Sequence, residues 1–192
     1  RGASYRDPRE WRNGLQVMRD LKPEVMMNTH ARTVTGGQEV FDAISNYMDM
    51  VTLVYDQSLR GILHGLGPDE LRYFIHQPKH LAEFPNNAQA YGEVPWFAPA
   101  AFYHQMGWFD RNVSNLHKLP PVEEAQRLVA MMGGRGKVLE AAKESLAKRE
   151  LAWAAQLGNY LFTIDPKDAD ALSRAREYDA DRSPTWSHRD RE

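Results

Sequence analysis

The chain has 192 residues, with 24 Lys and Arg against 26 Asp and Glu, and 42% of its residues are hydrophobic. This balance of charge argues against a nucleic-acid binder, whose phosphate contacts require clustered Lys and Arg. The sequence contains no cysteine, which excludes disulfides and thiolate metal sites, and no apolar run approaches the roughly 20 residues of a membrane span.

The first predicted element is a helix that begins at Pro8, with Asp7 as its N-cap, and ends before Lys22-Pro23. Its apolar residues recur at a helical period: Trp11, Leu15 and Met18. The short apolar run from Val25 to Met27 predicts a buried strand. We expect this strand to pair with a sheet that the chain does not contain.

His30 follows that strand directly, before a polar turn that ends in Gly36-Gly37. The carboxyl end of a strand is where α/β proteins place functional groups. On position alone His30 has two interpretations: a metal ligand, or a histidine hydrogen-bonded within its loop.

The segment from Gln38 to His64 predicts one long helix of roughly 40 Å. Its apolar residues form one stripe at three- and four-residue steps: Val40, Ile44, Tyr47, Met48, Val51, Val54, Tyr55, Leu59 and Ile62. The helices that follow are too small to cover such a stripe completely. We therefore expect self-association, or a complex with a further domain.

A short helix from Pro68 to Ile75 comes next, followed by His76 and His80. Two histidines four residues apart can bind zinc when both lie on one helix. Pro78 lies between them and breaks that helix, which favours surface loop residues.

The stretch from Tyr91 to Pro121 contains a predicted Pro95-Trp96 turn, an aromatic segment from Phe97 to Phe109, and a polar loop that leads to Pro120-Pro121. Aromatic residues at this density predict the wall of a pocket or an interface. The alternative is a buried helix followed by a surface loop.

The remainder of the chain predicts helices separated by glycines and turns. Their ranges are Val122 to Met132, Val138 to Ala147, Glu150 to Thr163 and Ala169 to Tyr178. Small residues at the predicted crossing and an Asp165-Pro166 turn are typical of a tetratricopeptide-like helix pair. The last residues, 181–192, are highly charged, and we expect them to be poorly ordered.

Several short motifs occur in an order that resembles the alkylsulfatase family, whose members are zinc hydrolases of the metallo-β-lactamase superfamily. These motifs are Arg1-Gly2, Arg6-Asp7, DQSLR (56–60), YGEVPW (91–96), GWFD (107–110) and Leu119-Pro120-Pro121. The resemblance covers nearly the whole chain. Because the chain does not begin with Met, we expect a fragment, a processed form or part of something larger.

The resemblance implies a role for four residues. His30 lies where the family has the last ligand of a two-zinc site, and Arg1 where it has an arginine near the sulfate. Tyr91 and Trp96 would line the path for an alkyl chain. The other zinc ligands would lie in an N-terminal metallo-β-lactamase part, so two zinc ions are expected only together with that part, and no catalytic residue is assigned here.

We therefore expect a mainly α chain in three parts. Residues 1–37 would be the last strand and helix of a metallo-β-lactamase αββα fold, residues 38–180 a helical dimerisation domain, and residues 181–192 a charged tail. The favoured function is part of a zinc-dependent hydrolase of alkyl sulfate esters that forms a homodimer. The alternative is a non-catalytic dimerisation or scaffold module of the same ancestry; the compartment stays open.

Overall fold

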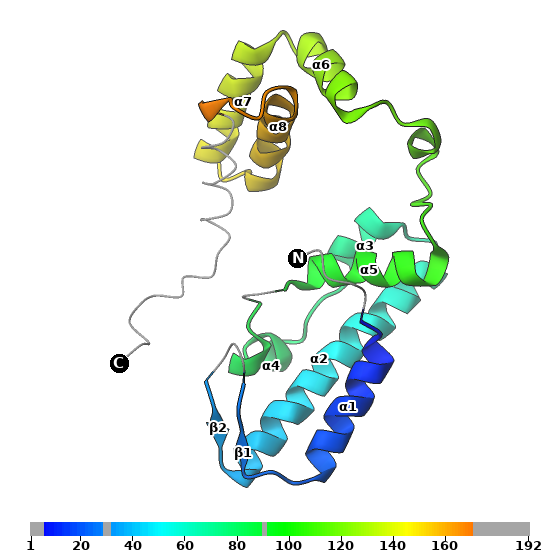
Figure 1. The fold of residues 1–192 in the computed structure, drawn as a ribbon, viewed down its shortest axis with the longest axis vertical. Helices are drawn as coiled ribbons and strands as arrows, with labels where there is room; N and C mark the ends of the chain where they lie inside the picture. The colour runs from blue at the N-terminus through cyan, green and yellow to red at the C-terminus, as the bar shows by residue number, and fades with distance from the viewer. Residues whose placement is uncertain (1–5, 29–31, 90–91, 171–192) are drawn as a thin grey trace. The chain divides into compact units, whose positions relative to one another are not determined.

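The computed structural model describes residues 6–28, 32–89 and 92–170. Within these ranges the protein is mainly helical, with eight α-helices, two 3-10 helices and a two-stranded hairpin (Figure 1). The chain forms two compact units, residues 1–115 and 116–192. This confirms the predicted mainly α class.

Helix α1 (Pro8–Asp20) lies alongside the first half of α2 (Gly37–Leu63) and runs antiparallel to it (Figure 1). As predicted, Asp7 caps α1, because its carboxylate accepts a hydrogen bond of 2.9 Å from the backbone N–H of Arg9. Trp11 packs edge-to-face on Tyr47 with ring centroids 5.5 Å apart. Between the two helices lies a small apolar cluster of Leu15, Val40, Ile44 and Met48.

The expectation of a buried strand paired outside the chain is wrong for the described residues. Strand β1 (Val25–Met26) pairs antiparallel with β2 (Val34–Thr35) in a local hairpin. The backbone N–H of Gly36 extends this pairing with a hydrogen bond of 2.8 Å to the carbonyl of Glu24. Val25 is 54% exposed. The two strands are close in the sequence, so β1 finds its partner locally.

The long helix predicted from Gln38 to His64 is confirmed as α2, but its apolar stripe is covered more than expected. The first half packs on α1, where Val40, Ile44 and Met48 are buried. In the second half Val54 is buried, whereas Val51 and Leu59 are half-buried. The chain's own helices therefore cover much of the surface that was assigned to a partner.

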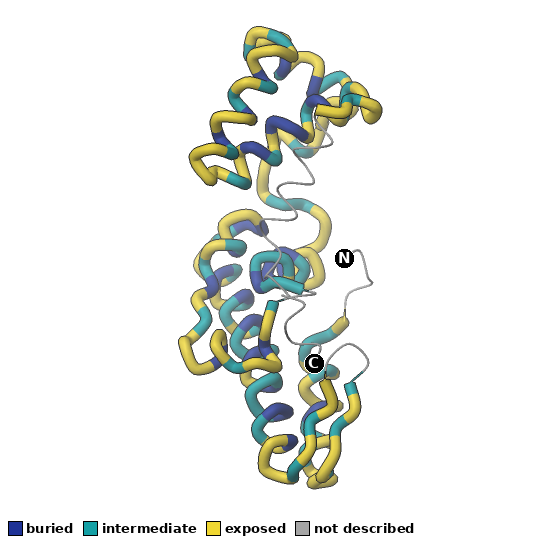
Figure 2. Tube along the Cα trace, turned by 90° about the vertical axis from the view of Figure 1, so that its left-hand side faces the viewer, coloured by how far each residue is buried: buried dark blue, intermediate teal, exposed yellow. Residues whose placement is uncertain are grey.

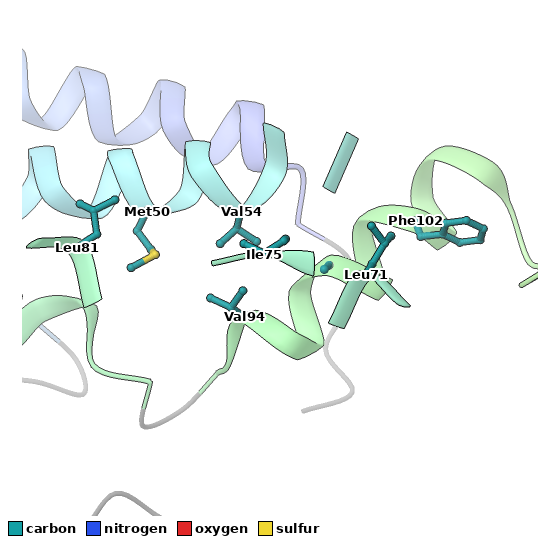
Figure 3. Close-up of a cluster of buried hydrophobic side chains, with 8 residues drawn as sticks. Met50, Val54, Leu71, Ile75, Leu81, Val94 and Phe102 are labelled. Atoms are coloured by element: carbon teal, nitrogen blue, oxygen red, sulfur yellow. The ribbon is translucent and has the colours of Figure 1, made fainter. Parts of the chain in front are cut away.

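The second half of α2 packs on α3 (Pro68–Phe74), α4 (Lys79–Ala82), the 3-10 helix η1 (Pro85–Asn87) and α5 (Val94–Met106). Their shared core contains Met50, Val54, Leu71, Ile75, Leu81, Val94, Ala98 and Phe102. In Figure 3, Val54, Ile75 and Val94 gather at the centre of this core. Gly61 allows α3 to approach, because a Cβ there would lie 2.4 Å from a methyl carbon of Leu71.

The second unit contains three helices: α6 (Pro121–Met131), α7 (Arg135–Ala147) and α8 (Leu151–Ile164). The 3-10 helix η2 (Val113–His117) precedes α6 in the sequence. The core of this unit consists of Val129, Val138, Ala142, Leu157 and Leu161, and Figure 2 draws buried residues in dark blue. Arg135 at the start of α7 donates two hydrogen bonds of 2.8 Å to Asp168 beyond α8. The charged tail lies outside the described residues, and so does the predicted helix from Ala169 to Tyr178 apart from its first two positions.

Candidate functional site

Three side chains in series hold the first residue of α5, Val94. Gln89 accepts a hydrogen bond of 2.7 Å from the backbone N–H of Val94 and donates one of 2.9 Å to the side-chain oxygen of Gln77. Gln77 in turn donates to the sulfur of Met50 on α2, at 3.2 Å. This series fixes the start of α5 on the core, and with it the position of Trp96.

Helix α5 begins where the sequence predicted a turn. Pro95 and Trp96 lie in its first turn, where a proline loses no hydrogen bond because the N–H groups there have no intrahelical partner. Trp96 is half-buried. The aromatic stretch is thus a helix followed by a surface loop, and Phe102 is its most buried aromatic residue, at 1% exposed.

Pro99 lies inside α5 and has no N–H to donate to the carbonyl of Pro95. Arg72 on α3 supplies the missing donor, since its Nη1 lies 3.1 Å from that carbonyl oxygen. The same guanidinium pairs with the exposed carboxylate of Asp69 through Nε, at 3.1 Å. Burial raises the pKa of nearby Tyr103, and the charges of Asp110 and Asp69 raise it further, opposed by Arg72.

The polar loop after α5 is held by its own side chains. Asp110 accepts hydrogen bonds from the backbone N–H of Asn112, at 2.9 Å, and from the side-chain amide of Asn115. Arg111 donates to the carbonyl of Gly65, just beyond the end of α2. The loop is therefore a folded connection.

Asn87 is a buried polar residue that no sequence motif indicated. Its amide nitrogen donates to the carbonyls of Leu81, at 3.1 Å, and Asn46, at 3.4 Å, and so ties η1 to α2. Its side-chain oxygen is buried and has no hydrogen-bond partner among the described residues. An asparagine between two apolar helices is the only signal in the sequence that could have indicated it.

Of the four residues to which the resemblance assigns a role, Trp96 lies in α5, as described above. Arg1, His30 and Tyr91 lie outside the described residues. His76 and His80 were both predicted to be surface loop residues: His76 is exposed in a loop, whereas His80 is exposed but lies in the short helix α4.

The described residues do not fit a zinc site on their own. In ranges 6–28, 32–89 and 92–170, no group of three or more His, Cys, Asp or Glu residues could hold a metal ion. A catalytic zinc requires about three protein ligands. In the same ranges, no helix has the length and apolarity needed to cross a membrane.

Comparison with known proteins gives a consistent result. A linear primary-alkylsulfatase from Pseudomonas sp. is 36% identical over 169 residues, which cover 88% of this chain and 32% of that protein. An alkyl/aryl-sulfatase from Saccharomyces cerevisiae is 30% identical and is matched over 97% of this chain and 30% of its own length. The chain therefore spans about a third of the length of these curated relatives.

A solved structure has the same fold. The stereoselective inverting sec-alkylsulfatase Pisa1 from Pseudomonas sp. superposes with a TM-score of 0.81 at 28% identity, over 92% of this chain and 28% of that chain. The family described as alkyl sulfatase dimerisation matches residues 67–188, from the start of α3 onward. These matches confirm the resemblance, and the chain belongs to the alkyl sulfatase dimerisation family.

Proposed function

We propose that this chain is the part of an alkylsulfatase that supplies a helical dimerisation domain together with the end of the catalytic domain. The observation that carries the proposal is the family match over residues 67–188, alongside relatives that are themselves alkylsulfatases. The substrate would be an alkyl sulfate ester, the reaction its hydrolysis, and the assembly a homodimer.

Residues 1–37 would belong to the preceding metallo-β-lactamase part, residues 38–180 to the dimerisation domain and residues 181–192 to a charged tail. The surface of α1 supports the first assignment. Gly14, Val17, Met18 and Leu21 lie on one face of α1, and Val17 and Leu21 are 62% and 75% exposed. An apolar helix face of this kind is normally covered by another element, and the upstream sheet would supply that cover.

The second unit supports the proposal of a tetratricopeptide-like pair. Helices α7 and α8 pack on each other, and the small residues Ala142, Ala154 and Gly158 are buried. Small residues allow two helices to approach closely, as in repeat pairs.

Four residues would form this chain's share of the active site. His30 would hold one zinc ion, Arg1 would contact the sulfate, and Tyr91 and Trp96 would line the path of the alkyl chain. Zinc would supply Lewis-acid stabilisation and a lowered pKa of bound water. The remaining ligands would come from the upstream part. The series from Met50 through Gln77 and Gln89 to Val94 supports the role of Trp96, because it fixes the turn that carries the indole.

The second candidate function is a dimerisation or scaffold module without catalysis. It is favoured by the family match itself, because the model that covers residues 67–188 describes dimerisation. The two candidates differ in what the parent protein holds upstream of Arg1: a His-x-His-x-Asp-His run there would favour the enzyme.

The test compares histidine variants of the parent protein. His30→Ala is expected to abolish most sulfate release from a medium-chain alkyl sulfate and to lower the zinc content. His76→Ala is the matched control, since that histidine is exposed, and it should keep zinc and rate. Elemental analysis beside the sulfate-release assay measures both. If His30→Ala keeps both zinc ions and the full rate, the ligand assignment is wrong and the scaffold function takes its place.

A further inference from the structure

Helix α5 has two apolar faces, and only one of them is packed. Val94, Ala98, Ala101 and Phe102 face the core shared with α2 and α3. Another row follows three-residue steps around the outside of the helix and is called here the α5 ridge: Phe97, Ala100, Tyr103 and Met106. Phe97, Tyr103 and Met106 are 46%, 44% and 56% exposed.

Such rows of side chains at three-residue spacing are the ridges with which one helix packs into the groove of another. A helix that is apolar on all sides is normally buried on all sides. Within the described residues, α5 makes its helix contacts with α2 and α3, which lie on its other face. The α5 ridge could therefore pack against another helix, but no helix among the described residues packs on it.

The surroundings of the ridge indicate what kind of surface it fits. Tyr103 lies within electrostatic reach of Asp69, Asp110 and Arg72, so the polar rim carries both signs of charge. Aromatic residues and Met at the centre with a polar rim are the composition of protein interfaces. A symmetric contact brings the same patch of each copy together and so requires self-complementarity. A neutral centre with a mixed-sign rim meets that requirement, whereas a rim of one sign would repel its own copy.

Phe97 is already held in place before any contact is made. A Cβ at Gly92 would lie 2.5 Å from the Cζ of the Phe97 ring, so the ring lies directly over that glycine. A side chain that is fixed in advance loses less conformational entropy on binding. The residue matches the pattern of a rigid aromatic anchor.

We propose that the α5 ridge is a contact between two copies of this chain. The inference rests on the homodimer proposed above and adds the surface through which it forms. The ridge lies within residues 67–188, the range matched by the dimerisation family. The α1 face, by contrast, lies outside that range.

The first experiment measures dimer dissociation by light scattering and analytical ultracentrifugation. Tyr103→Asp places a charge at the centre of the contact and is expected to raise the dimer dissociation constant at least about 10-fold. Met131→Asp makes an equally polar change at an exposed residue of α6 to which no contact is assigned, and it should leave the dissociation constant unchanged. Circular dichroism of each variant checks that the helices are retained.

The second experiment does not depend on disruption. The chain has no cysteine, so Ala100→Cys introduces a single thiol on the ridge. A short bis-maleimide reagent should then cross-link two copies, whereas Met131→Cys should remain uncross-linked. Cross-linking at 131 and not at 100 would overturn the proposal.

The outcomes separate the two proposals. If the unmodified chain is a monomer, the homodimer itself fails, and the ridge proposal fails with it. If it is a dimer that Tyr103→Asp does not weaken and that Ala100→Cys does not cross-link, the homodimer stands and this surface is wrong. The α5 ridge would then be expected to contact the upstream part of the protein instead.

Discussion

Arg72 on α3 donates a hydrogen bond of 3.1 Å to the carbonyl of Pro95 on α5, the carbonyl that Pro99 leaves without its intrahelical donor. A buried or half-buried carbonyl without a donor is destabilising by about 1–3 kcal/mol. One side chain from the neighbouring helix thus compensates for a proline inside α5.

Arg72→Ala is therefore expected to lower the free energy of unfolding by about 1–2 kcal/mol, measured by urea denaturation. Arg127→Ala is the control, since Arg127 makes an exposed ion pair with Glu123 within one helix, and its effect should stay below about 0.5 kcal/mol.

The double variant isolates the cause. Pro99→Ala restores an N–H in the helix that can donate to the Pro95 carbonyl, so Arg72→Ala should be less destabilising in that background. Equal effects of Arg72→Ala with and without Pro99 would contradict this account of the hydrogen bond.

Two glycines inside helices are expected to respond oppositely to alanine. At Gly61 a Cβ would lie 2.4 Å from Leu71 and 3.1 Å from Phe74, which forces α3 away from α2. Gly61→Ala should therefore lower stability by about 1–3 kcal/mol despite the better helix propensity of alanine. At Gly14 nothing lies within 4 Å, so Gly14→Ala should raise stability by about 0.5–1 kcal/mol. Thermal unfolding of both variants measures the difference, and a stabilised Gly61→Ala would show that α3 can move freely.

Signals local to each segment predicted the helices well. Asp7-Pro8 at the start and Lys22-Pro23 at the end specify α1 through capping and backbone restriction, which act within a few residues. The apolar period from Val40 to Ile62 likewise predicted α2. Which helices pack on each other is harder to infer. The apolar stripe of α2 does not indicate that α1 packs on its first half.

The start of α5 differs from the prediction for a related reason. Proline is common both in β-turns and in the first turn of a helix, so Pro95 alone does not distinguish them. The outcome depends on Gln89, whose side-chain oxygen accepts a hydrogen bond from the backbone N–H of Val94, five residues further along the chain. The strand at Val25 was assigned to an outside sheet because apolar runs do not encode their pairing partner. Asn87 and Arg72 act through contacts with distant carbonyls, which no spacing in the sequence records.

The cap of α1 should respond to acid. The hydrogen bonds from the side chain and the backbone N–H of Arg9 lower the pKa of Asp7 from 3.8 to about 2. A lowered folded-state pKa means that the stabilising contribution is present above pH 3.8 and is lost as the pH falls toward about 2. A carboxyl-detected NMR titration should follow Asp7 through this range.

Asp7→Asn is the control for that titration, because asparagine also caps a helix but does not ionise. The difference in urea midpoint between the unmodified chain and Asp7→Asn should shrink as the pH is lowered through the same range. A difference that stays constant down to about pH 2 would mean that the hydrogen bonds from Arg9 to the ionised Asp7 carboxylate do not stabilise the folded state.

Gly92 and Phe97 should be coupled in stability. A methyl group at position 92 would lie 2.5 Å from the Phe97 ring, and Gly92 has no positive φ, so alanine fits the backbone there and only the ring must move. Gly92→Ala is expected to displace the ring and to lower the free energy of unfolding by about 1 kcal/mol. In a Phe97→Ala background the same substitution has nothing to displace and should be neutral. A double-mutant cycle by urea denaturation gives the coupling directly. A coupling free energy of zero would show that the ring of Phe97 does not pack on Gly92.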